Sequence, residues 1–104
     1  MFFQYGPEIG FVKLTSSGVV GDSGKAQALY GYAFQSDGTV GVISFFNGTS
    51  SVSPSTLVFN DTGVVNVTKV VPLNGGVVFP NGLFASFDSH VTPYATLFVR
   101  QVLT

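Results

Sequence analysis

The chain has 104 residues, of which 45% are hydrophobic and 9% are charged, whereas an average soluble domain has about 25% charged residues. This length predicts one domain with a modest core. The net charge is −1 and the four Lys and Arg residues are scattered, which argues against nucleic acid as a partner because phosphates require clustered cations. Without cysteine the chain has no disulfide, so its composition does not indicate a redox compartment.

We expect neither a membrane span nor a signal peptide from the sequence. No apolar run approaches 18 residues, so we expect no transmembrane helix and no membrane partner. The start, MFFQYGPEIG, lacks the basic residues, long apolar run and cleavage site of a signal peptide. We therefore expect a protein that is made in a cytoplasm and used without export.

The low charge also bears on the surface of the domain. A domain of this size leaves about a third of its unfolded-chain surface exposed, and a net charge near zero favours association. Two interpretations remain open: a weakly charged monomer, or a chain partly covered by a partner or by copies of itself. Large exposed apolar patches are rare on monomers, which favours the second.

Residues 1–10 form a short aromatic arm with Phe2, Phe3 and Tyr5, followed by Gly6-Pro7. The arm is too short and too interrupted for a helix. It could dock on a neighbouring molecule or form an edge strand of its own sheet. We name Phe2, Phe3 and Tyr5 as candidate protein–protein contacts.

The remainder, residues 11–104, is predicted to be a single β domain. Apolar and β-branched runs predict strands at 9–14, 19–20, 28–35, 40–46, 56–60, 64–71, 75–79, 83–87 and 94–99. Four Asn-Gly or Asp-Gly pairs, which favour hairpin turns, begin at residues 37, 47, 74 and 81. Pro72 is expected to end the strand before it, and residues 75–100 are expected to form a three-stranded antiparallel unit. The pattern predicts a β-sandwich of about eight antiparallel strands, jelly-roll-like, with a small closed barrel as second choice.

Two strands carry apolar residues on both faces. On the strand at 28–35, Tyr30, Tyr32 and Phe34 share a face, which could stack a sugar or a partner but is better explained as core. Gly31 in the same strand predicts a bulge or a close backbone approach.

The closing strand has Tyr94, Phe98 and Arg100 on one face and Ala95, Leu97 and Val99 on the other. A sandwich strand with one wet face should alternate cleanly between apolar and polar residues. A strand apolar on both sides is therefore central and covered, or lies at a subunit interface. We name Tyr94, Phe98 and Arg100 as further candidate contacts.

Catalytic, cofactor and metal sites are not predicted. Ser86, Asp88 and His90 lie two residues apart, side by side on an extended strand, whereas a triad needs Ser–His and His–Asp hydrogen bonds in line. The five acids are isolated from one another, and one histidine without cysteine does not make a zinc site. The glycines precede no helix and match no nucleotide motif. We therefore expect no enzyme and no cofactor.

Four segments together resemble small all-β proteins encoded in the genomes of tailed bacteriophages, especially those of marine and cyanobacterial hosts. The segments are LTSSGVV at 14–20, ALYGYAF at 28–34, GVVFPNGLFASF at 76–87 and YATLFVR at 94–100. The resemblance covers residues 14–100, and its motifs are a Leu-Tyr-Gly strand, a Phe-x-x-Gly-Leu turn and a final strand ending in an aromatic residue and Arg or Tyr. Residues 1–10 have no counterpart.

The resemblance implies a virion structural protein. Proteins of this kind are capsid decoration or cement proteins, or small parts of tail and fibre assemblies. The expected partners are the major capsid protein or another virion protein, together with copies of the chain itself as a trimer or dimer. The alternative is a tail- or fibre-associated module that binds a carbohydrate or receptor. The expected location is the virion, after synthesis in the host cytoplasm.

Overall fold

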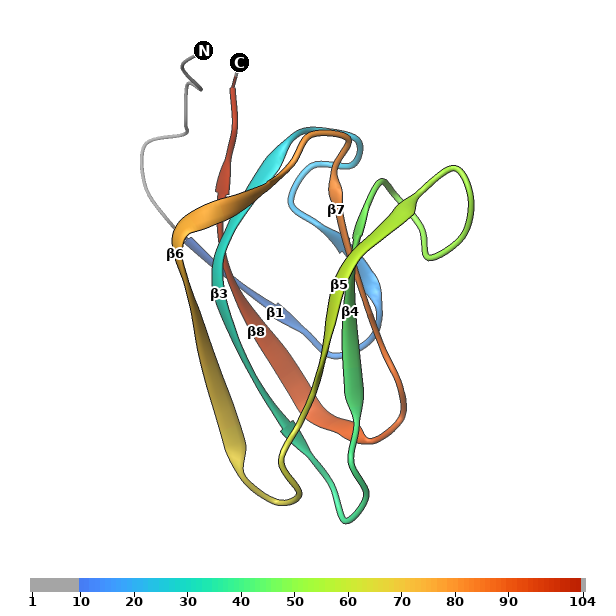
Figure 1. Ribbon diagram of the computed structural model, residues 1–104, viewed down its shortest axis with the longest axis vertical. Coiled ribbons are helices and arrows are strands. Elements are labelled where there is room, and N and C mark those ends of the chain that lie inside the picture. The colour runs from blue at the N-terminus through green and yellow to red at the C-terminus, as the bar shows by residue number, and fades with distance from the viewer. Residues whose placement is uncertain (1–9, 104) are drawn as a thin grey trace.

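The computed structural model describes residues 10–103, which form eight β-strands and no helix (Figure 1). Within this range no helix is long and apolar enough to cross a membrane. The strands are β1 (Gly10–Leu14), β2 (Gly18–Val20), β3 (Gln27–Ser36), β4 (Val42–Asn47), β5 (Thr56–Thr62), β6 (Thr68–Phe79), β7 (Leu83–Phe87) and β8 (Val91–Gln101).

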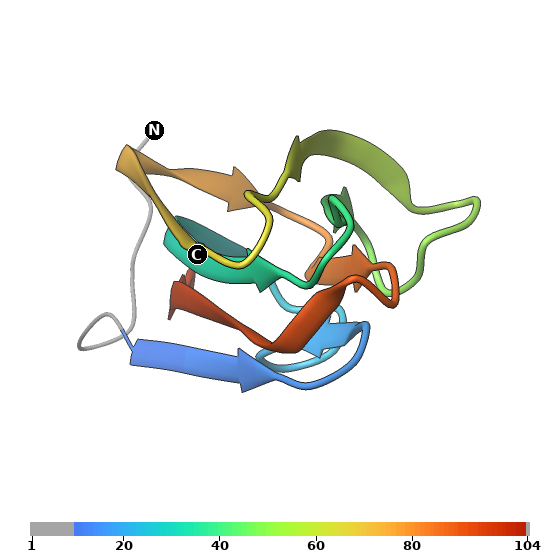
Figure 2. The same ribbon diagram turned by 90° about the horizontal axis from the view of Figure 1, so that it is seen from below.

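The strands form two four-stranded antiparallel sheets. One has the order β1-β8-β3-β6 and is called here the β8 sheet, and the other has the order β2-β7-β4-β5 and is called the β7 sheet. Figure 2 shows the sheets facing each other, with β1 and β2 along one side and β5 and β6 along the other.

The strand pairs are nested: β1 pairs with β8, β2 with β7, β3 with β6 and β4 with β5. Four nested antiparallel pairs that are divided between two packed sheets form the jelly-roll arrangement. The predicted all-β, jelly-roll-like sandwich is therefore confirmed.

The core lies between the sheets and takes alternate residues from each. From the β8 sheet it includes Leu29, Tyr32 and Phe34, and from the β7 sheet Ile43 and Phe45, all buried. The Tyr32 and Phe45 rings lie 4.9 Å apart between centroids, and those of Phe45 and Phe59 lie 4.8 Å apart. Aromatic contacts of this kind join the two layers.

A bulge at Tyr30 explains why β3 changes faces. Leu29 pairs with Val77 on β6, but Gly31 pairs with Pro72, so four residues of β6 lie opposite Tyr30 alone. A Cβ added to Gly31 would lie 3.0 Å from the Val71 carbonyl oxygen, which confirms the predicted bulge and close approach. The bulge also corrects the predicted aromatic face: Tyr32 and Phe34 are in the core, whereas Tyr30 is not a member of it.

The structure corrects the predicted strand at 64–71 and its end at Pro72. Residues 64–67 make only isolated bridges, with Asn66 at φ 58°, and β6 begins at Thr68. It then passes through Pro72 because β6 is an edge strand, where a missing N–H is tolerated.

The predicted three-stranded unit at 75–100 is also wrong. The turn at Asn81-Gly82 leads from β6 in the β8 sheet to β7 in the β7 sheet, and β8 then returns to the first sheet. The turn at Asp37-Gly38 likewise connects strands of different sheets. Asn74-Gly75 lies inside β6, among the four residues opposite Tyr30. Only Asn47-Gly48 begins a connection between neighbours in one sheet, β4 and β5.

Candidate interaction surface

The outward side of the β8 sheet is apolar. Phe98 of β8 pairs with Phe11 of β1 and with Gly31 of β3, and Gly31 pairs in turn with Pro72 of β6. In the next row, Thr96 of β8 pairs with Ala33 of β3, and Ala33 pairs with Val70 of β6. Tyr94 lies two residues before Thr96, on the same side of β8. We call this set the apolar outer face, and it consists of Phe11, Ala33, Val70, Pro72, Tyr94 and Phe98.

Several side chains of the apolar outer face are strongly exposed. The exposed fractions are 71% for Phe11, 67% for Val70, 40% for Tyr94 and 37% for Phe98. The opposite side of β8 is fully used, since Ala95, Leu97 and Val99 are buried. The strand is thus central, as expected, but nothing in the described part of the chain covers its outer side.

The predicted contacts on β8 occupy this one surface. Tyr94, Phe98 and Arg100 alternate with the buried residues of the strand and share its outward side. The Lys13 ammonium lies 4.3 Å from the centre of the Tyr94 ring, a cation–π contact that orders the ring. The other predicted contacts, Phe2, Phe3 and Tyr5, lie outside the described residues, as does the arm except for Gly10, the first residue of β1.

The β8 sheet has only one sign of charge. Its four strands contain Lys13, Lys69 and Arg100 but no Asp or Glu. Lys69 is paired with Asp61 of β5 at 2.7 Å, and Lys13 lies against the Tyr94 ring at the outward side. A complementary partner would be apolar, with a carboxylate near Lys13.

The sequence interpretation missed Phe11, Val70 and Pro72 as members of this face. Alternation alone places Phe11 with Lys13, but it does not say which side of the strand faces water. Val70 is part of a β-branched run that gives no contrast between its sides. Only the register across β1, β8, β3 and β6 brings these residues together.

Ser86, Asp88 and His90 do not form the line of side-chain hydrogen bonds that a triad needs, because the His90 ring bonds Asp37 instead. Ser86 pairs with Ser44 in the β7 sheet, while Asp88 accepts hydrogen bonds from the His90 and Val42 amides at 3.0 and 3.2 Å. The His90 ring donates from Nδ1 to Asp37 at 3.1 Å. Hydrogen bonds from the Thr39 amide and from His90 hold the pKa of Asp37 below its usual value. These contacts brace two turns against each other.

Tyr32, Asp61 and Lys69 form a polar cluster between the sheets. The Tyr32 hydroxyl donates to Asp61 at 2.7 Å, and Lys69 donates to the other Asp61 oxygen. Burial raises the pKa of Tyr32 well above its usual value, and the hydrogen bond and the negative charge of Asp61 add to this effect. Burial alone would raise the pKa of Asp61, but the hydrogen bonds from Lys69 and Tyr32 outweigh it and the pKa is lowered.

Metal-ligating residues do not gather anywhere within residues 10–103: no three His, Cys, Asp or Glu residues lie together there. A hollow of about 270 Å³ borders the apolar outer face and is lined by Ala33, Phe34, Gln35, Thr68, Pro93, Tyr94 and Thr96. It could receive a side chain of a docked partner.

Comparison of the chain with protein-family models, with curated proteins and with solved structures finds no match. The resemblance to bacteriophage proteins therefore stays a prediction.

Proposed function

We propose that the chain is a virion structural protein of a tailed bacteriophage, and specifically a capsid decoration or cement protein. The observation that carries the proposal is the apolar outer face, because large exposed apolar patches mark interaction sites. The low charge and the resemblance to phage proteins point the same way. The protein would be made in the host cytoplasm and would act in the virion.

The proposed mechanism is stabilisation by mass action. A protein that binds the assembled shell but not its dissociated subunits lowers the free energy of the assembled state. The outer face would contact the major capsid protein, another virion protein or a second copy of the chain in a dimer or trimer. Phe2, Phe3 and Tyr5 would extend this contact, since the arm joins β1 at the edge of the same sheet.

The alternative is a tail- or fibre-associated module that binds a carbohydrate or receptor through the Tyr30/Tyr32 stripe or through an aromatic residue of a loop. Tyr32 is only 2% exposed and its hydroxyl is bonded to Asp61. The stripe therefore does not offer a platform, which counts against this form of the alternative. The braced turns at Asp37, Asp88 and His90 likewise favour a role without catalysis.

The test is co-sedimentation with empty shells of the phage whose genome encodes the chain. The double variant Tyr94→Ser/Phe98→Ser should bind at least about tenfold more weakly, because central aromatic residues dominate interface energies. The matched control is Leu57→Ser, an exposed apolar residue on β5 of the other sheet, which should bind normally. Deleting residues 1–9 should also abolish binding while the domain stays folded.

Two results would contradict the proposal. One is unchanged shell binding by the double variant. The other is the absence of the chain from purified virions analysed by mass spectrometry.

A further inference from the structure

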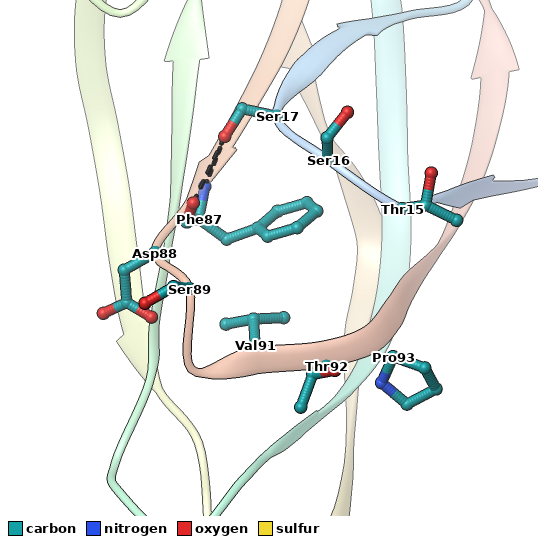
Figure 3. Close-up of a pocket in the computed structure, with 9 residues that line it drawn as sticks. All are labelled: Thr15, Ser16, Ser17, Phe87, Asp88, Ser89, Val91, Thr92 and Pro93. Atoms are coloured by element: carbon teal, nitrogen blue, oxygen red, sulfur yellow. Dashed lines mark hydrogen bonds between the residues drawn. The ribbon is translucent and has the colours of Figure 1, made fainter.

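A pocket of about 500 Å³ lies at one end of the sandwich, away from the centre of the apolar outer face (Figure 3). The β1–β2 connection, the β7–β8 connection and the start of β8 form its walls. The lining residues are Thr15, Ser16, Ser17, Phe87, Asp88, Ser89, Val91, Thr92 and Pro93. This volume is within the range of about 300–1,000 Å³ that is usual for small-molecule sites.

The walls of the pocket are fixed by hydrogen bonds. The Ser17 hydroxyl accepts from the Phe87 amide at 2.9 Å and donates to the Phe87 carbonyl at 3.3 Å, which ties the two connections together. Asp88 is held by the amides of Val42 and His90, and the Val91 amide donates to the Asp88 carbonyl at 3.2 Å. A ligand would therefore meet a preorganised site and would lose little affinity to ordering it.

The polar groups of the pocket keep unused capacity. The hydroxyls of Thr15, Ser16, Ser89 and Thr92 make no hydrogen bond to the rest of the described chain, and each can donate one and accept two. The Asp88 carboxylate is not among these groups, because it faces the Val42 and His90 amides and is directed away from the Phe87 ring (Figure 3). Donors and acceptors are thus both available along the pocket wall.

The lining excludes several ligand classes. It contains no Lys or Arg to hold a phosphate or carboxylate, and one carboxylate does not make a divalent-cation site. An entirely apolar ligand would leave the hydroxyls without partners. The remaining class is a neutral molecule with many hydroxyls and one less polar side.

The Phe87 ring is the apolar surface of the pocket that the less polar side of such a ligand would contact. Figure 3 shows the ring between the loop that carries Thr15–Ser17 and the strand that carries Val91–Pro93. An aromatic face is electronegative and attracts the C–H groups on one side of a sugar ring. We propose that this pocket binds a neutral saccharide, with the sugar ring against Phe87 and its hydroxyls on Ser16, Ser89 and Thr92. The site does not depend on shell docking and differs from the rejected Tyr30/Tyr32 stripe.

The experiment is an NMR titration of the full chain with neutral sugars such as glucose, galactose, mannose and N-acetylglucosamine, and with their disaccharides. At least one should give saturable shifts confined to amides of residues 15–17 and 87–92. The expected Kd is on the order of 1 mM, as for a ligand of about a dozen non-hydrogen atoms with ordinary efficiency. Glycerol, which has hydroxyls but no ring, should give no saturation.

Three variants locate the site. Phe87→Leu keeps an apolar side chain against the core and removes the aromatic face, and it should weaken binding about tenfold. Thr92→Val, at an exposed position that does not threaten folding, should weaken binding about threefold by removing one hydroxyl. The control is Thr49→Val, which changes a loop hydroxyl in the hollow lined by Asn47, Pro54 and Asn81 and should bind like the parent chain.

The proposal is overturned if no sugar gives saturable shifts at concentrations far above the expected Kd. It is also overturned if the shifts map elsewhere, or if Phe87→Leu and Thr92→Val both bind normally. Equal saturation by glycerol would contradict recognition of a sugar ring.

Discussion

The outward sides of the two sheets differ in how they treat their apolar residues. On the β7 sheet, Phe84 pairs with Phe46 and Val19, and the Phe46 and Phe84 rings pack edge to face with centroids 6.5 Å apart. A neighbouring row pairs Ser86 with Ser44 and Ser44 with Asn60. On the β8 sheet, Phe11 and Val70 are more than two-thirds exposed.

The surface has two kinds of aromatic residue, those that pack against each other and those that are exposed to solvent. Phe46 and Phe84 are half-buried by each other, so they contribute to the stability of the single domain. Phe11 and Phe98 contribute less to that stability, and their exposed surface becomes useful when something covers it.

The largest effect is expected in the shared core. Phe45 is fully buried and contacts the rings of Tyr32 and Phe59, so Phe45→Ala should lower the free energy of unfolding by about 3–5 kcal/mol. Urea denaturation followed by circular dichroism measures this loss. The contrast between buried and outward aromatic residues would fail if Phe98→Ala were equally costly.

The second effect concerns the link between the sheets. Asp61→Ala removes the acceptor of Tyr32 and Lys69 and should cost about 1–3 kcal/mol at neutral pH. Because the pKa of folded Asp61 is lowered, its contribution is present above the unfolded pKa of about 3.9 and is lost as the pH falls through the folded value. Urea melts at pH 7 and at lower pH should therefore show the parent and variant converging in acid. A difference that persists or grows in acid would contradict this role.

The smallest effects distinguish the two outward sides directly. Phe46→Ser should lower the free energy of unfolding by roughly 1–2 kcal/mol, because it removes a half-buried ring and its contact with Phe84. Phe11→Ser should change it by less than about 0.5 kcal/mol, as exposed substitutions usually do. Thermal or urea unfolding of the matched pair measures both values. Equal losses would mean that the faces do not differ as described.

Much of the fold could be predicted from local sequence signals. The strand at residues 83–87 follows from its apolar run and from the turn residues before it. The same signals did not give the partners, because Asn81-Gly82 marks where a strand ends but not which sheet the next one joins. The bulge at Tyr30 shifts the alternation of β3, so that Leu29 points into the core before the bulge and Tyr32 and Phe34 point into it after the bulge. A regular alternation of residues does not predict this shift.

The candidate surface was predictable in part, for a similar reason. Alternation placed Tyr94, Phe98 and Arg100 on one side of the closing strand, and the structure has them there. Phe11 and Val70 join them only through pairing across the sheet, over separations of more than twenty residues. The pocket around Phe87 likewise depends on a contact between residues 17 and 87. Such contacts follow from topology and not from local composition.

The nested strand pairs have a consequence for how the chain reaches its folded state. Gly10 pairs with Val99, and β8 lies between β1 and β3, so the β8 sheet lacks one of its two central strands until β8 has been synthesised. Only β4 and β5 are neighbours in both sequence and space, and the other pairs must close longer loops before they gain contacts. A chain interrupted before β8 would leave the edges of β1 and β3 open to pairing with other chains. Addition of β8 would cover one edge of β1 and one edge of β3 at the same time.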